Sequence, residues 1–237
     1  MSPFMGELMG TMFLIILGDG VVAEVLLKKS KGENSGWIVI TTGWAFAVMV
    51  GVFVAQAFGS AGAHINPAVS VGMAMAGKFS WADVPLFIVA QLIGAFIGGV
   101  IVWLAYFPHW EPTEDAGLKL AVFSTGPAIR NTVWNNITEI IGTFVLVMGV
   151  AAIFAQTISP GVGPFLVGVL VWGIGLSLGG PTGYAINPAR DLGPRIAHAI
   201  LPIAGKGGSD WGYAWIPVVG PLIGGIIAGL LIAASGI

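Results

Sequence analysis

Two similar stretches decide the fold: GAHINPAVSVGMAMAG at residues 62–77 and GYAINPARDLGPRIAH at residues 183–198. Each contains an Asn-Pro-Ala triplet. Asn favours the N-cap of a helix, and Pro is tolerated at the first helical position because its missing N–H would be unpaired there. The triplets therefore predict two helices, over 66–77 and 187–198. Both are too short to cross a bilayer, which requires about 20 residues.

The composition around these stretches is that of an integral membrane protein. Of 237 residues, 56% are hydrophobic and only 8% are charged, whereas about 25% are charged in a soluble domain. The 37 glycines suit the close contacts between membrane helices. Six apolar windows predict transmembrane helices, and their ranges are 4–27, 37–58, 84–106, 134–156, 163–180 and 214–236.

The order of sequence features repeats along the chain. Glu-x-x-Gly-Thr at 7–11 recurs at 139–143, and Gly-x-x-x-Gly at 94–98 recurs at 220–224. Each half holds three spans, an odd number, so the second half enters the membrane from the opposite side. We expect an all-α membrane protein with six transmembrane helices and two re-entrant half-helices in an inverted repeat. The single channel domain and its two repeats are predicted over 1–237, 1–132 and 133–237.

These features resemble the aquaporin family, or major intrinsic proteins, over essentially the whole chain. Asp191 after Asn-Pro-Ala-Arg, and Pro217 in the last span, resemble the aquaglyceroporin branch. The resemblance implies a channel for facilitated diffusion of glycerol and similar small uncharged solutes, with some water. It implies no catalysis, cofactor or metal. It also implies a homotetramer in the lipid bilayer of the plasma membrane, with both termini in the cytoplasm.

The paired triplets have a physical use in a channel. If the half-helices enter from opposite faces, two N-termini meet, each carrying about +0.5 charge, and they repel cations but not neutral molecules. We expect the two asparagines to cap backbone N–H groups and to direct their NH2 groups into the lumen. The triplet residues are Asn66, Pro67, Ala68, Asn187, Pro188 and Ala189.

A narrow selectivity filter is implied by the same resemblance. Arg190 is costly at membrane depth and should face a wet cavity. Tyr184 and Gly175 match further filter positions. Gly175 stands where water channels typically have His, and its missing side chain widens the constriction. The fourth position is assigned to Trp44, with Phe46 as the alternative from counting back along the chain.

Other polar residues lie inside the apolar segments. Glu7 and Glu139 occupy equivalent positions, and ionisable residues inside apolar spans normally face the interior and are paired. The resemblance implies that both support the half-helix loops rather than relay protons. His64 resembles a pore-lining residue, with loop bracing as the alternative, and Asp191 is a further pore-lining or support residue. Asp19 and Glu24, near the end of the first span, are expected to have structural or interfacial roles, which include pairing with the lysines at 28–31.

Several alternatives are weighed against the glycerol channel. They are a strict water channel, a channel for a neutral acid such as lactic acid, and an ion-coupled carrier, which shares inverted repeats and broken helices. Cys is absent and the net charge is −2, which argues against thiolate metal sites and nucleic-acid binding. The loop charges favour the reverse orientation, because Lys and Arg are normally enriched in cytoplasmic loops. The resemblance places these basic residues outside: Lys28, Lys29, Lys31, Lys119, Arg130 and Lys206.

Overall fold

A computed structural model describes residues 1–159 and 161–237, and every regular element in these ranges is helical. The elements are α1 (Pro3–Leu26), α2 (Trp37–Ala57), α3 (Pro67–Met75), α4 (Val84–Ala105), the 3-10 turn η1 (Phe107–His109), α5 (Ala116–Phe123), α6 (Thr132–Phe154), α7 (Val162–Leu178), α8 (Pro188–Ile200) and α9 (Ile216–Ser235). The all-α fold with two short helices at the triplets is confirmed.

Five helices of the described residues are long and apolar enough to cross a membrane: α1, α2, α4, α6 and α9. The sixth predicted span, 163–180, is α7, whose 17 residues lie at the lower end of the spanning range. Large apolar side chains such as Leu86, Val169 and Leu230 lie exposed on these helices. An apolar exterior is the surface that a lipid environment requires.

Glycines set the distances between helices in the two repeats. In the first repeat α1 packs against α2 and α4, and in the second α6 packs against α7 and α9. A Cβ at Gly94 would overlap the carbonyl oxygen of Leu8, and one at Gly224 would overlap that of Ile140. Leu8 and Ile140 each follow the repeated Glu. The Gly-x-x-x-Gly faces therefore pack equivalent helix pairs, as small residues do in membranes.

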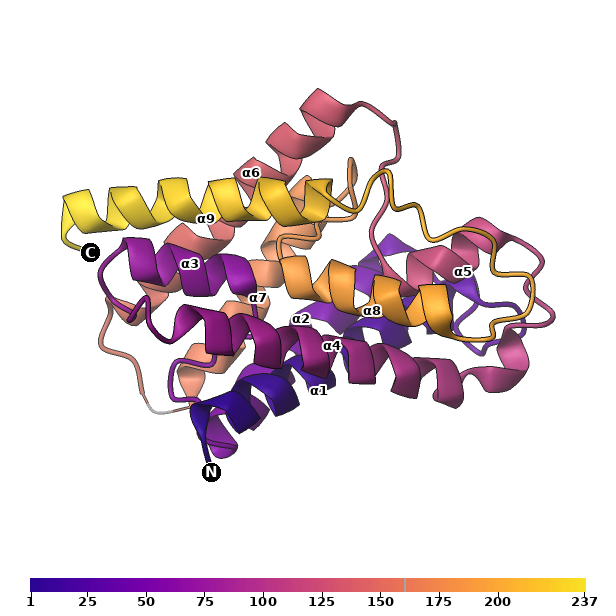
Figure 1. Ribbon diagram of the computed structural model, residues 1–237, viewed down its shortest axis with the longest axis horizontal. Helices are drawn as coiled ribbons and strands as arrows, with labels where there is room; N and C mark the ends of the chain where they lie inside the picture. Colours follow the sequence, from indigo (N-terminus) through magenta and orange to yellow (C-terminus); the bar gives the residue numbers. More distant parts are fainter. Residues whose placement is uncertain (160) are drawn as a thin grey trace.

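The half-helices join the two repeats at the centre. Figure 1 shows α3 and α8 lying roughly end to end, with both chain termini at the end of the molecule opposite α5. Helix α3 packs against α9, and α8 packs against α4, so each half-helix contacts the last membrane-spanning helix of the other repeat. Their bounds differ slightly from the predicted ranges, since α3 ends at Met75 and α8 continues to Ile200.

Candidate pore

The two triplets form helix caps that are also joined to each other. The side-chain oxygen of Asn66 accepts from the Ala68 N–H at 2.8 Å, and that of Asn187 accepts from the Ala189 N–H at 3.0 Å. The Asn66 amide donates to the Ile186 carbonyl, and the Asn187 amide donates to the Ile65 carbonyl, both at 2.8 Å. One N–H of each amide is therefore used across the repeat, and only the second remains for the lumen.

Each triplet follows a loop with unusual backbone conformation. Ala63 and Ile65, three and one residues before Asn66, have φ values of 44° and 45°. Tyr184 and Ile186, at the same places before the second Asn, have φ values of 39° and 43°. Positive φ is a genuine outlier for a β-branched residue, and such strain costs about 1–3 kcal/mol per residue. Both loops therefore need stabilising contacts.

The buried Glu7 carboxylate stabilises the first loop. It accepts four hydrogen bonds, and the donors and distances are Ser60 Oγ at 2.6 Å, His64 N–H at 2.8 Å, Ile65 N–H at 2.7 Å and Gln91 Nε2 at 2.7 Å. Two of these donors are backbone N–H groups of the strained loop. Hydrogen bonds to charged groups contribute about 1.5–3 kcal/mol each.

Glu139 makes the equivalent contacts in the second repeat. It accepts from Thr182 Oγ1 at 2.7 Å, Ala185 N–H at 3.0 Å and Ile186 N–H at 2.8 Å. The geometry is that of loop support. The sequence analysis did not identify Gln91, although an amide inside an otherwise apolar span is a signal that could have found it.

A cavity of about 310 Å³ passes the ends of both half-helices. Its lining includes both cap residues, Asn66 and Asn187. The other lining residues include Lys78, Phe154, Trp44, Tyr184 and Arg190. Much of the remaining wall is apolar, contributed by residues such as Leu14, Val48, Val52, Leu146, Val167 and Val171. A channel with an apolar wall and a few hydrogen-bonding groups suits a solute that has both a carbon backbone and hydroxyl groups.

Arg190 and Trp44 meet in the lining of this cavity. The guanidinium carbon lies 3.9 Å from the centroid of the Trp44 ring, within the range of a cation–π contact. Trp44 is only 4% exposed, whereas Phe46 is 54% exposed and is not among the lining residues. Of the two candidates from the second span, Trp44 is therefore the one placed beside Arg190.

Gly175 lies behind the Tyr184 ring rather than in the cavity lining. A Cβ at Gly175 would lie 2.8 Å from Tyr184 Cζ and 3.1 Å from Thr41 Cγ2. Trp37 donates from its indole N–H to the Gly175 carbonyl at 3.2 Å and packs edge-on against Tyr184. The absence of a side chain at Gly175 thus provides the space that Tyr184 occupies.

Replacing Gly175 by Ala is expected to lower glycerol permeability by about threefold and to affect water less, because the added methyl pushes the Tyr184 ring toward the cavity. The matched control is Gly173→Ala on the same helix, where a Cβ meets nothing within 4 Å. Stopped-flow light scattering on proteoliposomes measures both permeabilities. An equal loss for both solutes would show that Gly175 does not set the width of the passage.

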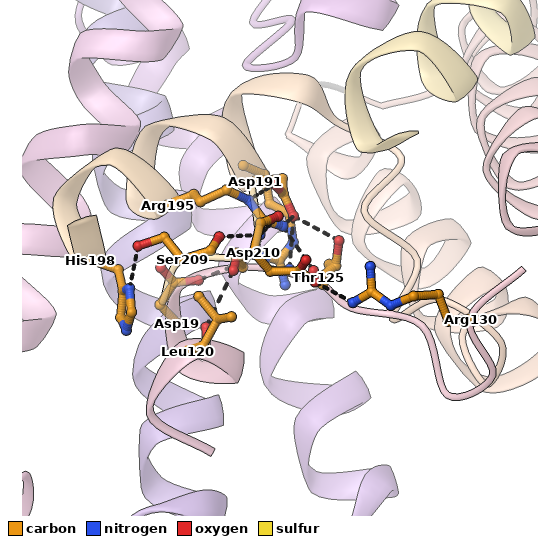
Figure 2. A network of polar contacts seen from close by, with 11 residues as sticks. Asp19, Leu120, Thr125, Arg130, Asp191, Arg195, His198, Ser209 and Asp210 are labelled. Atoms are coloured by element: carbon orange, nitrogen blue, oxygen red, sulfur yellow. Dashed lines mark hydrogen bonds and ion pairs between the residues drawn. The ribbon is translucent and has the colours of Figure 1, made fainter. Parts of the chain in front are cut away.

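Asp191 lies outside the lining and anchors loops instead. It accepts from Arg195 Nε at 2.8 Å and from Nη2 at 3.0 Å, and from Thr125 N–H at 2.8 Å. Arg195 also donates to the carbonyls of Thr125, Ser209 and Asp210 (Figure 2). The sequence analysis did not identify Arg195, yet a second arginine four residues after Asp191 in a re-entrant helix was a detectable signal.

The other polar candidates have defined partners. His64 lines the cavity, its Nδ1 lies 3.0 Å from Ser70 Oγ, and its ring packs against Phe79 and Phe87. Glu24 accepts from the Gly32 N–H at 2.7 Å, which supports the loop after α1. Asp19, in contrast, pairs with Arg190 and with no lysine of the described residues: its Oδ1 lies 3.6 Å from Arg190 Nη1.

The comparisons with known proteins agree with this geometry. The family model described as "Major intrinsic protein" matches residues 1–232. The chain is 61% identical over 231 residues to a probable glycerol uptake facilitator protein of Thermotoga maritima, covering 98% of each chain. It is 60% identical over 227 residues to glycerol uptake facilitator protein 3 of Lactiplantibacillus plantarum, covering 96% of this chain and 94% of that relative. Among solved structures it is similar to the aquaglyceroporin from Plasmodium falciparum, with a TM-score of 0.78, 29% identity and coverage of 95% and 92%.

Proposed function

Because the chain belongs to the major intrinsic protein family, we propose that it is a channel for the facilitated diffusion of glycerol and similar small uncharged solutes, with some water. The observation that carries the proposal is the cavity that passes both asparagine caps and reaches Trp44, Tyr184 and Arg190. The names of the relatives, glycerol uptake facilitators at 61% and 60% identity, support the same solute.

Solutes are selected at two positions along the pore. At the half-helix ends, two helix N-termini face one region of the lumen, and their dipoles disfavour cations while leaving neutral solutes unaffected. The second N–H of each asparagine amide donates to a passing hydroxyl group. At the other place, the aromatic faces of Trp44 and Tyr184 contact the carbon backbone of the solute, and Arg190 donates hydrogen bonds to its hydroxyls.

Membership of the same family supports the proposed cellular setting of the channel. The protein is integral to a membrane, and we place it in the plasma membrane with both termini in the cytoplasm. We propose a homotetramer with one pore in each subunit. The two proposed repeats extend over 1–132 and 133–237, and η1 and α5 are the elements of the first that have no counterpart among the described helices of the second.

Osmotic measurements on proteoliposomes test the proposal. Vesicles containing the protein are expected to re-swell in a glycerol gradient faster than protein-free vesicles, with a rate that does not depend on sodium or proton gradients. Water flux without glycerol flux would identify a strict water channel. Flux of lactic acid that exceeds glycerol flux would identify an acid channel, and glycerol flux that follows an ion gradient would identify a coupled carrier.

A further inference from the structure

Asp19 is a buried carboxylate that takes part in none of the hydrogen bonds described above. It lies on α1, its side chain is 0% exposed, and neither of its oxygens has a hydrogen-bond donor among the described residues. A buried charge is costly unless it is paired. Glu7, on the same helix, illustrates the contrast, because four donors surround it.

The cation that faces Asp19 is Arg190, with 3.6 Å between Oδ1 and Nη1. Nη1 is itself buried and has no hydrogen-bond acceptor in the described part of the chain, so the ion pair is the polar contact that it makes. Asp191, the acidic residue that directly follows Arg190 in the chain, is paired with Arg195 at 2.8 Å instead. Lys28, the lysine nearest in sequence, pairs with Glu33 at 2.7 Å.

The position of Asp19 depends on the glycine before it. A Cβ at Gly18 would overlap the ring of Trp44, so this glycine allows the ring to lie directly on α1. Asp19 is thereby brought beside the guanidinium that the same ring contacts at 3.9 Å. The guanidinium is held on its face by Trp44 and at Nη1 by Asp19.

We propose that Asp19 is the positioning residue that holds the Arg190 guanidinium against Trp44 and so keeps the filter wide enough for glycerol. The inference rests on the proposed function. Without the carboxylate, the guanidinium loses its anchor at Nη1 and turns toward the lumen, where it narrows the passage. Water, the smaller solute, is then obstructed less than glycerol.

The test is Asp19→Asn, which keeps the shape of the side chain and removes its charge. The ratio of glycerol to water permeability is expected to fall by about fivefold. In an Arg190→Ala background the same substitution is expected to leave the ratio unchanged, because its effect acts through the guanidinium. Glu24→Gln is the matched control on α1: its carboxylate bonds Gly32 and Tyr106, and the ratio should stay at the wild-type value.

An unchanged ratio in Asp19→Asn, or an equal fall in the Arg190→Ala background, would overturn the inference. Should Asp19→Asn not fold alone, thermal stability replaces flux as the readout. Arg190→Ala leaves Asp19 buried and uncompensated, so the double variant is expected to melt higher than Arg190→Ala, and a lower melting temperature would contradict the pair. Wild-type vesicles that pass no glycerol would refute the proposed function itself, whereas a conducting wild type with an unchanged variant refutes only the role of Asp19.

Discussion

Replacing Glu7 by Ala is expected to abolish glycerol flux and to lower the melting temperature of the detergent-solubilised protein by about 8 °C or more. The substitution leaves four buried donors without their acceptor, two of them backbone N–H groups of the strained loop before Asn66. Each unsatisfied buried donor costs about 1–3 kcal/mol, so the total is about 4 kcal/mol or more. Thermal unfolding and vesicle flux provide the two measurements.

Two controls distinguish loop support from a general effect of lost charge. Glu7→Gln should be milder than Glu7→Ala, because Gln keeps one acceptor oxygen and the buried Gln91 Oε1, which has no partner in the described residues, can accept from the new amide. Glu111→Ala removes an exposed carboxylate and should leave both measurements unchanged. Wild-type stability and flux in Glu7→Ala would contradict the support role.

Arg195→Met is expected to lower the melting temperature by about 6 °C or more, because breaking a buried ion pair costs about 3–5 kcal/mol. Arg195 and Asp191 are both fully buried. Removing the guanidinium leaves the Asp191 charge without its cation and releases the carbonyls of Thr125 and Ser209. Glycerol flux should fall as well, because Asp191 directly follows Arg190 in the chain. Thermal unfolding monitored by size-exclusion chromatography measures the stability change.

Arg130→Met is the matched control, since both arginines contact Asp210. Arg130 binds the Asp210 carboxylate at 2.5 Å, but its side chain is 58% exposed, and exposed ion pairs contribute about 0–1 kcal/mol. Its melting temperature should therefore change little. Adding Asp191→Asn to Arg195→Met should recover part of the lost stability, because the uncompensated charge is removed. Equal effects of the two arginine variants would refute the network of Figure 2 as a stabilising element.

The architecture was predictable because its signals are local and occur twice. Asn and Pro at a helix start, and apolar windows of spanning length, each depend on neighbouring residues only. The repeated Glu and the repeated Gly-x-x-x-Gly then related the two halves. The family resemblance implied that Glu7 and Glu139 support the loops, and both carboxylates accept from backbone N–H groups of those loops.

The partners across the pore were decided by the tertiary structure alone. The sequence by itself determined an all-helical membrane protein with two half-helices that start at Asn66 and Asn187. It did not determine that each asparagine amide bonds the opposite loop, that Tyr184 fills the space at Gly175, or that Asp19 faces Arg190. These contacts join residues far apart in the chain, and their distances depend on how closely the helices approach. That approach is set by glycine contacts between helices such as Gly94 against Leu8 and Gly18 against Trp44, which only the packed fold brings together.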